Sequence, residues 1–296
     1  MGRALATPIL HPGAPKTATT TLQYILRENR RALQEKGIGL ILPEDIRGKP
    51  FLGAYLAAYR GKHIPQMPRL TAEFFAPYLS KFQTVICSEE TFCHDFMPSL
   101  RFGSGGIDKA HLTAAILSQS GADKTRVVLT IRPQMDFLIS TYTHFVHRQG
   151  ELRSFPDWID AEVRLKKMRW APAVAAFRHR FGSDAVDVVS MAQHDRIEGF
   201  LSAVLDRLSV GELPIAMPSG DRMNPSPSAE AVQKCRAINA VILSNALSES
   251  VNSQLVEDYP AEEHGKFYPH LWVKPMGLDY EFASDHDAAL LPPQTA

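Results

Sequence analysis

The chain has 296 residues, 45% of them hydrophobic, which is enough apolar material to bury a sizeable core in one domain. Lysine plus arginine and aspartate plus glutamate balance at 32 each, so the formal net charge is zero and the basic excess that accompanies broad nucleic-acid binding is missing. No apolar run approaches the roughly 20 residues that a membrane-spanning helix needs.

The first predicted unit is a strand, a tight turn and a helix. The apolar stretch Ala4–Leu10 predicts the strand, and a helical pattern runs from about Thr19 to Glu35. A helix N-terminus offers unpaired backbone N–H groups and the positive end of a dipole, so the turn between the two is suited to hold a phosphate or sulfate group. The turn adds one lysine and four hydroxyl side chains: Lys16, Thr17, Thr19, Thr20 and Thr21.

An ATP-binding P-loop, with the pattern G-x-x-x-x-G-K-[ST], is the obvious competitor for this turn. Lys16 and Thr17 match its last two positions. Pro15 stands at the second glycine and Leu10 at the first, so the pattern fails at both glycines. A threonine-rich helix N-terminus with an incidental lysine is the simplest structural alternative.

The next predicted strands are Gly37–Leu42 and Thr84–Ser88. The segment between them mixes helical and loop patterns and carries aromatic residues that we expect mostly in the core, with a few available to line an acceptor pocket: Phe51, Tyr55, Tyr59, Phe74, Phe75 and Tyr78. Glu89 and Glu90 directly follow the strand Thr84–Ser88. Because adjacent residues of an extended chain point to opposite sides, we expect only one of these carboxylates to face a site at the sheet edge.

The middle of the chain predicts a second anion site. A glycine-rich loop over Ser99–Asp108 precedes a helix over Lys109–Ser120, and the β-branched run Arg126–Ile131 predicts a buried strand. Arg132 follows that strand directly, at the edge where ligands of parallel α/β sheets bind. Ser140 lies eight residues later, about two turns along the helix that follows.

The last third predicts a helix over Val174–Phe181, a strand over Ala185–Met191 and a helix over Ala229–Leu247. After residue 248 the periodicity fades, which indicates an irregular appendage over 248–296 that could cap the site. Before the first of these helices lies a basic cluster of Arg164, Lys166, Lys167 and Arg169. We expect it to form a solvated helix face, or else to bind an acidic acceptor or the nucleotide phosphates.

Strands and helices alternate along the chain, a pattern that predicts a three-layer α/β fold with a central parallel sheet flanked by helices. With no internal repeat and no dividing linker, residues 1–296 are expected to form a single domain. The three cysteines, Cys87, Cys93 and Cys235, cannot all pair, and their spacing suits no zinc motif. The N-terminus lacks a signal-peptide core, and Ala6 spoils the myristoylation pattern, so we expect a cytoplasmic protein.

The turn 15–20, Pro-Lys-Thr-Ala-Thr-Thr, resembles the 5′-phosphosulfate loop of sulfotransferases that use PAPS (3′-phosphoadenosine 5′-phosphosulfate), in which a strand leads into Pro-Lys-[Ser/Thr]-Gly-Thr-Thr and a helix. Ala18 departs from the family's glycine, and an alanine is awkward if the backbone there needs a positive φ angle. Arg132 and Ser140 are similar to the arginine and serine, eight positions apart, that hold the 3′-phosphate. Over about residues 5–245 the chain thus resembles a bacterial-type PAPS-dependent sulfotransferase with a P-loop-like α/β fold.

The resemblance implies in-line transfer of a sulfuryl group from PAPS, with release of the 3′,5′-bisphosphate PAP and no metal. Lys16 would neutralise charge on the 5′-phosphate as the S–O bond breaks. The implied donor-binding residues are Pro15, Lys16, Thr17, Ala18, Thr19, Thr20, Thr21, Arg132, Ser140 and Arg222, with Asn224 as an alternative to the last. The base is expected among four residues, in the order Glu90, Glu89, His94 and His111, the last of which falls in a predicted helix.

The sequence does not name the acceptor, but it is compatible with a hydroxyl or amine of a carbohydrate, a lipid or a small metabolite. It does not indicate the oligomeric state. Two other functions stay open. One is a P-loop-type nucleotide kinase or NTPase that uses Mg-ATP, against which the missing glycines and the lack of an obvious metal-binding aspartate count. The other is a non-catalytic nucleotide-binding relative, which Ala18 favours.

Overall fold

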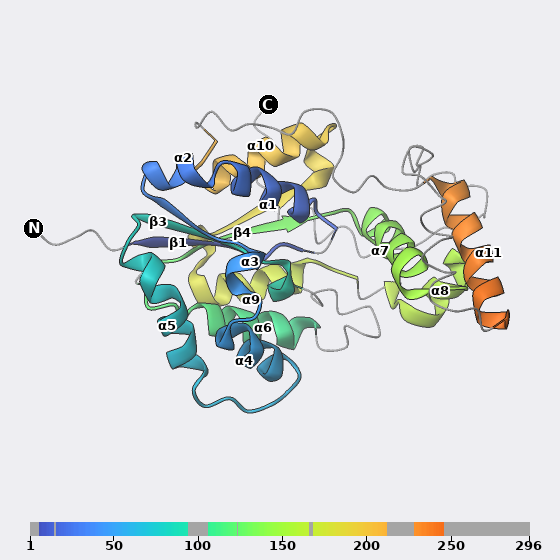
Figure 1. Ribbon diagram of the computed structural model, residues 1–296, viewed down its shortest axis with the longest axis horizontal. Helices are drawn as coiled ribbons and strands as arrows, with labels where there is room; N and C mark the ends of the chain where they lie inside the picture. The colour runs from blue at the N-terminus through green and yellow to red at the C-terminus, as the bar shows by residue number, and fades with distance from the viewer. Residues whose placement is uncertain are drawn as a thin grey trace, which may run out of the picture.

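Five parallel strands form one sheet at the centre of the computed structural model (Figure 1), in the order β2-β3-β1-β4-β5. The strands are β1 (Thr7–His11), β2 (Ile38–Ile41), β3 (Thr84–Ser88), β4 (Arg126–Ile131) and β5 (Val186–Ser190). The structure describes residues 6–14, 16–93, 106–122, 124–165, 168–211 and 228–245. The predicted parallel α/β sheet is confirmed, and β3 and β4 have the bounds that the sequence predicts.

Helices cover both faces of the sheet, because the strands are apolar on both sides and successive side chains point opposite ways. Ile9 packs in one buried cluster with Leu22 and Val204, whereas its neighbour Leu10 packs in a second cluster with Phe177. The first cluster lies under α1 (Thr19–Glu28), α2 (Arg30–Glu35) and α10 (Ile197–Arg207), which are seen on one side of the sheet in Figure 1.

The second cluster lies on the opposite face, under α4 (Pro50–Tyr59), α5 (Met67–Leu79), α6 (Gly106–Leu117) and α9 (Ala171–Phe181). The aromatic residues of the segment after β2 belong to it: Phe51, Tyr55 and Phe75 are buried, and Tyr59, Phe74 and Tyr78 pack against it. Their expected place in the core is therefore confirmed.

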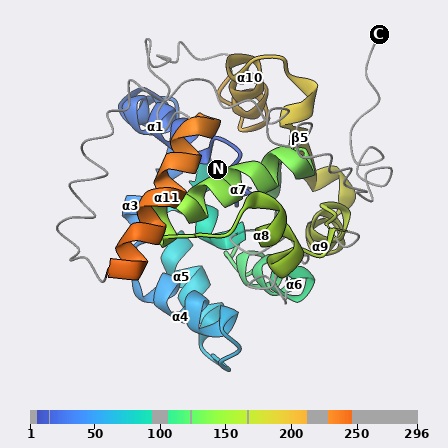
Figure 2. The same ribbon diagram turned by 90° about the vertical axis from the view of Figure 1, so that its right-hand side faces the viewer.

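Three helices lie beyond the carboxyl ends of the strands (Figure 2): α7 (Gln134–Gln149), α8 (Phe155–Glu162) and α11 (Ala229–Asn245). The Asn239 side-chain amide of α11 donates to the carbonyl oxygens of Val146 and Glu151 at 2.9 and 3.2 Å. The Arg236 guanidinium donates to Leu152 O at 3.2 and 3.1 Å. These bonds occupy carbonyl groups at and just after the end of α7, where the helix offers no partner of its own.

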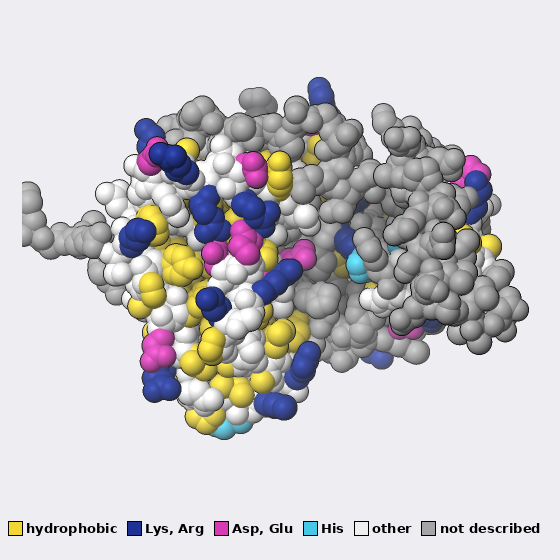
Figure 3. All heavy atoms as spheres, in the orientation of Figure 1, with side chains coloured by type: hydrophobic (Ala, Val, Ile, Leu, Met, Phe, Trp, Pro, Cys, Tyr) yellow, Lys and Arg dark blue, Asp and Glu magenta, His cyan; other side chains and the backbone are white. Residues whose placement is uncertain are grey.

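The short helix α3 (Pro43–Ile46) is held to α1 and α2 by ion pairs on the surface, where basic and acidic side chains lie next to each other in Figure 3. Arg27 pairs with Glu44 at 2.8 Å, and Arg30 pairs with Asp45 at 2.8 Å. Exposed pairs of this kind add little to stability. They fix where the chain turns after β2, just before Arg47.

Two helical predictions differ from the structure. The single helix expected over Thr19–Glu35 is two helices, with a break at Asn29, whose side chain donates to Ile25 O at 2.8 Å beside its own backbone N–H at 3.2 Å. Helix α10 was not predicted, although its buried residues recur at helical spacing: Phe200, Leu201, Val204 and Leu205.

Several expectations fall outside the described residues. These are most of the loop Ser99–Asp108, the segment 212–227 and the tail 248–296. Within the described part of the chain, no helix is both long and apolar enough to cross a membrane.

Candidate functional site

The candidate site lies at the carboxyl edge of the sheet, where β1 is flanked by β3 and β4. His11, the last residue of β1, is paired in register with Ser88, the last residue of β3. The loop after β1, Glu89 after β3 and Arg132 after β4 therefore begin on three neighbouring strands. Ligands of open α/β sheets bind at this edge.

The loop after β1 follows a backbone path that most residues avoid. Gly13, Lys16 and Ala18 have positive φ angles of 65°, 64° and 57°. A Cβ atom on Gly13 would lie 3.0 Å from Thr19 Oγ1 and 3.4 Å from Cε1 of His11, so this position requires glycine for its space as well as its conformation. Ala18 takes the left-handed conformation without being glycine, which costs on the order of 1 kcal/mol.

The N-terminus of α1 is open toward this loop. Ala18 precedes the helix and offers no side-chain hydrogen bond to it, and the first turn contains no acidic residue. Thr19 is only 3% exposed. Its buried hydroxyl has no hydrogen-bond partner among the described residues. Thr20 is exposed and Thr21 is half-buried. Unpaired N–H groups, a positive dipole end and an unsatisfied hydroxyl together suit an anion.

The two segments that the sequence marks as anion sites meet in the structure. The Arg132 guanidinium donates from Nη1 to the backbone oxygen of Lys16 at 3.0 Å. Burial lowers the pKa of Arg132, and the nearby Asp136 carboxylate opposes that effect. Because an arginine starts from a very high pKa, Arg132 keeps its positive charge at neutral pH.

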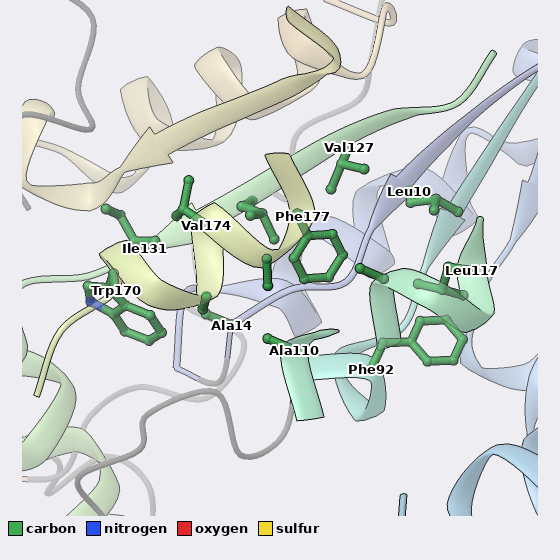
Figure 4. Close-up of a cluster of buried hydrophobic side chains, with 14 of the residues drawn as sticks. Leu10, Ala14, Phe92, Ala110, Leu117, Val127, Ile131, Trp170, Val174 and Phe177 are labelled. Carbon is green, nitrogen blue, oxygen red and sulfur yellow. The ribbon is translucent and has the colours of Figure 1, made fainter. Parts of the chain in front are cut away.

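Trp170 at the start of α9 holds the backbone of this arginine. Its indole nitrogen donates to Arg132 O at 2.7 Å, and its ring meets Phe137 of α7 edge to face at 5.5 Å. Figure 4 shows Trp170 beside Ala14 of the loop and Ile131 of β4. The turn between β4 and α7 is thus fixed by Trp170 as well as by the bond between Arg132 and the loop.

Ser140 lies in α7 and is half-buried. It is four residues after Asp136, so the two side chains share one face of the helix. Asp136 also acts electrostatically on the Arg132 guanidinium. Ser140 thus lies on the same helix face as Asp136, in the helix that begins two residues after Arg132.

Glu89 and Glu90 differ in their surroundings. Glu89 is fully buried, and its Oε1 accepts from the backbone N and the hydroxyl of Thr91 at 3.0 and 2.7 Å. Arg47 Nη2 lies 3.4 Å from the same oxygen, while Oε2 has no hydrogen-bond partner among the described residues. Glu90 is half-buried and begins the 3-10 helix η1 (Glu90–Cys93). The backbone N of Glu89 donates to His11 O at 3.3 Å, so this carboxylate borders the start of the loop.

Buried polar side chains beneath the loop form a connected set. The Thr17 hydroxyl donates to Ala14 O at 2.7 Å and contacts Thr130 Oγ1 at 2.7 Å. The side chain of Thr17 therefore holds the loop from inside. The set continues through His11, whose Nε2 lies 3.5 Å from Thr130 Oγ1 and whose Nδ1 lies 2.9 Å from Ser88 Oγ. Gln23 of α1 completes it, donating to Ser88 Oγ and Ser88 O at 3.3 and 3.2 Å.

Other expected site residues lie elsewhere or outside the description. His111 is exposed on α6, where its ring faces His179 of α9 at 6.2 Å. Arg164 and Arg169 follow α8 in a non-helical segment, so the solvated helix face expected for the basic cluster is wrong for these two residues. Six residues with proposed contacts lie outside the described part of the chain: Pro15, His94, Lys166, Lys167, Arg222 and Asn224.

The sequence interpretation missed three residues that support the site. His11 had a signal, since it is a polar residue at the end of a strand that is otherwise apolar. Trp170 and Arg47 had none, because their contacts join segments that are far apart in the chain: Trp170 to Arg132, and Arg47 to Glu89.

No family model matches the chain, and no curated protein matches its sequence. Among solved structures, the chain is similar to a sulfotransferase from Alicyclobacillus acidocaldarius, with a TM-score of 0.41 and 13% sequence identity, over 76% of this chain and 88% of that one. At this identity and TM-score the likeness carries no weight for the reaction, and we base the function on the residues of the site.

Proposed function

We propose that the protein transfers a sulfuryl group from PAPS to a hydroxyl or amine acceptor. The observation that carries this proposal is the 3.0 Å hydrogen bond from Arg132 to Lys16 O, because it brings two anion-binding segments together. PAPS carries two separate anionic groups, a 3′-phosphate and a 5′-phosphosulfate, and so calls for two such segments. ATP carries one phosphate chain and needs only one.

The residues present fit a phosphate at the loop. The unsatisfied Thr19 hydroxyl and the uncapped N-terminus of α1 supply donors, and Gly13 leaves open the space that a Cβ atom would fill. Thr20 and Thr21, in the same first turn, add hydroxyl groups for the phosphate oxygens. Lys16 adds a positive charge to the same loop.

The 3′-phosphate belongs to the second segment. The planar guanidinium of Arg132 suits bidentate binding of a phosphate, and in this proposal Ser140 of α7 offers a hydroxyl to the same group. In this arrangement Thr17 acts through the loop conformation, since its hydroxyl proton is already donated to Ala14 O.

The chemistry that PAPS supplies is a sulfuryl group on a phosphate leaving group: the S–O bond to the 5′-phosphate breaks as an S–O bond to a hydroxyl acceptor, or an S–N bond to an amine acceptor, forms, and PAP is released. Lys16 neutralises the negative charge that grows on the phosphate oxygen. The N–H groups of the first turn of α1 hold the same phosphate in line. Most of the rate enhancement then comes from positioning and charge stabilisation, as in phosphoryl transfer.

We place Glu89 before Glu90 as the base that removes the acceptor proton, which reverses the order expected from the sequence. One oxygen of Glu89 is anchored by Thr91 and Arg47, which fixes the carboxylate, and the other has no partner among the described residues. A fixed carboxylate with one available oxygen is the arrangement that general-base catalysis needs.

The acceptor classes that we propose are those compatible with the sequence: a carbohydrate, a lipid or a small metabolite. A P-loop-type kinase or NTPase and a non-catalytic relative are the outcomes that would replace sulfuryl transfer. Turnover of Mg-ATP in place of PAPS would favour the first, and binding of PAP without transfer to any acceptor would favour the second.

The test is PAPS turnover with a panel of hydroxyl and amine acceptors, using the whole chain. Lys16→Ala should abolish transfer, and Glu89→Gln should lower kcat by roughly 100-fold or more, the usual range for loss of a general base. Glu90→Gln and the exposed Lys49→Ala serve as matched controls and should change kcat less than about threefold. Full activity of Lys16→Ala would overturn the proposed function, and a larger loss in Glu90→Gln than in Glu89→Gln would overturn the assignment of the base.

A further inference from the structure

For the buried polar side chains beneath the loop, the donor and the acceptor of each hydrogen bond can be assigned. The single hydroxyl proton of Thr17 goes to Ala14 O, so the short contact between Thr17 and Thr130 requires Thr130 to donate. The proton of Thr130 is then used, and its oxygen must accept from Nε2–H of His11. At the other end, Ser88 Oγ accepts from the Gln23 amide.

This proton count fixes the tautomer of His11. A neutral imidazole with its proton on Nε2 has an acceptor at Nδ1, which takes the Ser88 hydroxyl proton at 2.9 Å. A protonated ring would be a donor at both nitrogens, and Nδ1 could then no longer accept the Ser88 hydroxyl proton. Full burial keeps the ring neutral, because it lowers the pKa of His11 to about 4.

The bonds of His11 reach all three neighbouring strand ends. Through Thr130 and Thr17 its side chain supports the loop that carries Lys16, and Thr130 stands two residues before Arg132. Its Nδ1 is bonded to Ser88, which directly precedes Glu89 in the chain. The backbone oxygen of His11 also accepts from the N–H of Glu89 at 3.3 Å. Few side chains could make both connections, since they require a donor and an acceptor on opposite sides of one rigid ring.

We propose that His11 is a positioning residue of the transfer reaction, which holds the donor loop through Thr130 and the Glu89 strand end through Ser88. This inference rests on the proposed function, because the loop and Glu89 matter to the reaction only if the donor binds there. It assigns no contact between His11 and the substrate.

Two substitutions separate the two bonds. His11→Gln places an amide N–H near the position of Nε2 and keeps the donation to Thr130. His11→Asn places a carbonyl oxygen near Nδ1, keeps the bond from Ser88 and loses Thr130. We expect His11→Asn to weaken binding of PAP by about tenfold or more, a change of about 1.4 kcal/mol, while His11→Gln stays within about threefold of the native protein.

The matched control is Thr113→Val, which removes another buried hydroxyl pair, the 2.7 Å contact between Tyr55 and Thr113, away from the site. It should lower the unfolding temperature while leaving PAP affinity unchanged. If His11→Asn does not fold, Thr130→Val tests the same bond and should show the same tenfold loss of affinity.

The measurement is calorimetric titration with PAP, together with thermal unfolding of each variant. Retained PAP affinity in His11→Asn, or an equal loss in Thr113→Val, would overturn the role of His11 and leave the proposed function standing. Failure of the native protein to bind PAP would overturn both.

Discussion

The polar residues at the strand ends fall into two groups that the sequence does not distinguish. His11 and Ser88 are buried and bonded to each other, and the buried Thr17 is linked to His11 through Thr130, whereas Lys16 and Thr20 have side chains that reach the surface. Residue type and spacing in the sequence indicate a polar turn after an apolar strand in either case. Which hydroxyl faces inward depends on the backbone angles at Gly13, Lys16 and Ala18, which only the structure gives.

Burial of His11 makes stability depend on pH in a defined window. Its pKa is lowered from 6.5 to about 4 by burial, so between these values the unfolded chain binds a proton that the folded protein does not. Stability is therefore complete above pH 6.5 and is lost as the pH falls toward 4. From pH 7 to pH 5 the loss from this residue is about 2 kcal/mol.

Chemical denaturation at pH 7 and pH 5 measures this effect, and His11→Gln is the comparison because glutamine does not titrate. The paired carboxylate of Glu44 does not interfere, since its pKa is lowered to about 2 and its contribution is lost below this window. An equal pH dependence in the native protein and in His11→Gln would contradict the prediction.

Ala18 is the position where the chain departs from the glycine of the loop that it resembles. The alanine holds a left-handed backbone (φ 57°, ψ 22°), which glycine adopts without steric cost. We expect Ala18→Gly to stabilise the protein by relieving about 1 kcal/mol of backbone strain. Part of this gain is offset, because glycine raises the conformational entropy of the unfolded chain. Thermal unfolding checks this, with Ala203→Gly inside α10 as a control that should destabilise. A lower unfolding temperature for Ala18→Gly would show that the loop does not carry this strain.

At the scale of elements, long apolar runs were predictable and interruptions were not. The strands β3 and β4 match their predicted bounds because each is a short, fully buried run of β-branched residues. The break between α1 and α2 lies at Asn29, whose side chain and backbone N–H both donate to Ile25 O, and a periodic pattern cannot reveal it. The start of α6 at Gly106 is three residues earlier than predicted, since glycines argue against a helix.

Helix α11 is joined to α7 mainly through the end of that helix. Asn239 satisfies the carbonyl groups of Val146 and Glu151, which have no partner inside α7. We expect Asn239→Ala to lower the free energy of unfolding by about 1–2 kcal/mol, because it removes two hydrogen bonds to partly buried carbonyl groups. Chemical denaturation gives the value. Lys234→Ala, which removes an exposed pair with Glu230 on the same helix, should change stability by less than about 0.5 kcal/mol, and equal effects of the two substitutions would contradict this role.

For the whole molecule, the alternation of strands and helices predicted the layers and the parallel sheet. It also predicted that the two anion-binding segments lie at one edge, since the ends of parallel strands meet there. It did not predict their direct contact through Arg132 and Lys16 O, nor the different burial of Glu89 and Glu90. Both depend on strand order and on contacts between distant segments, such as Arg47 with Glu89.

The proposed function requires two phosphate sites side by side at the carboxyl edge of the sheet. Calorimetric titration of the whole chain with PAP and with ATP, both without magnesium, tests it most directly. We expect PAP to bind, and binding to weaken by tenfold or more in both Arg132→Ala and Lys16→Ala, about 1.4 kcal/mol or more for each. Binding of ATP but not of PAP, or PAP affinity that is unchanged in Arg132→Ala, would contradict the second site and favour a kinase-like use of the loop.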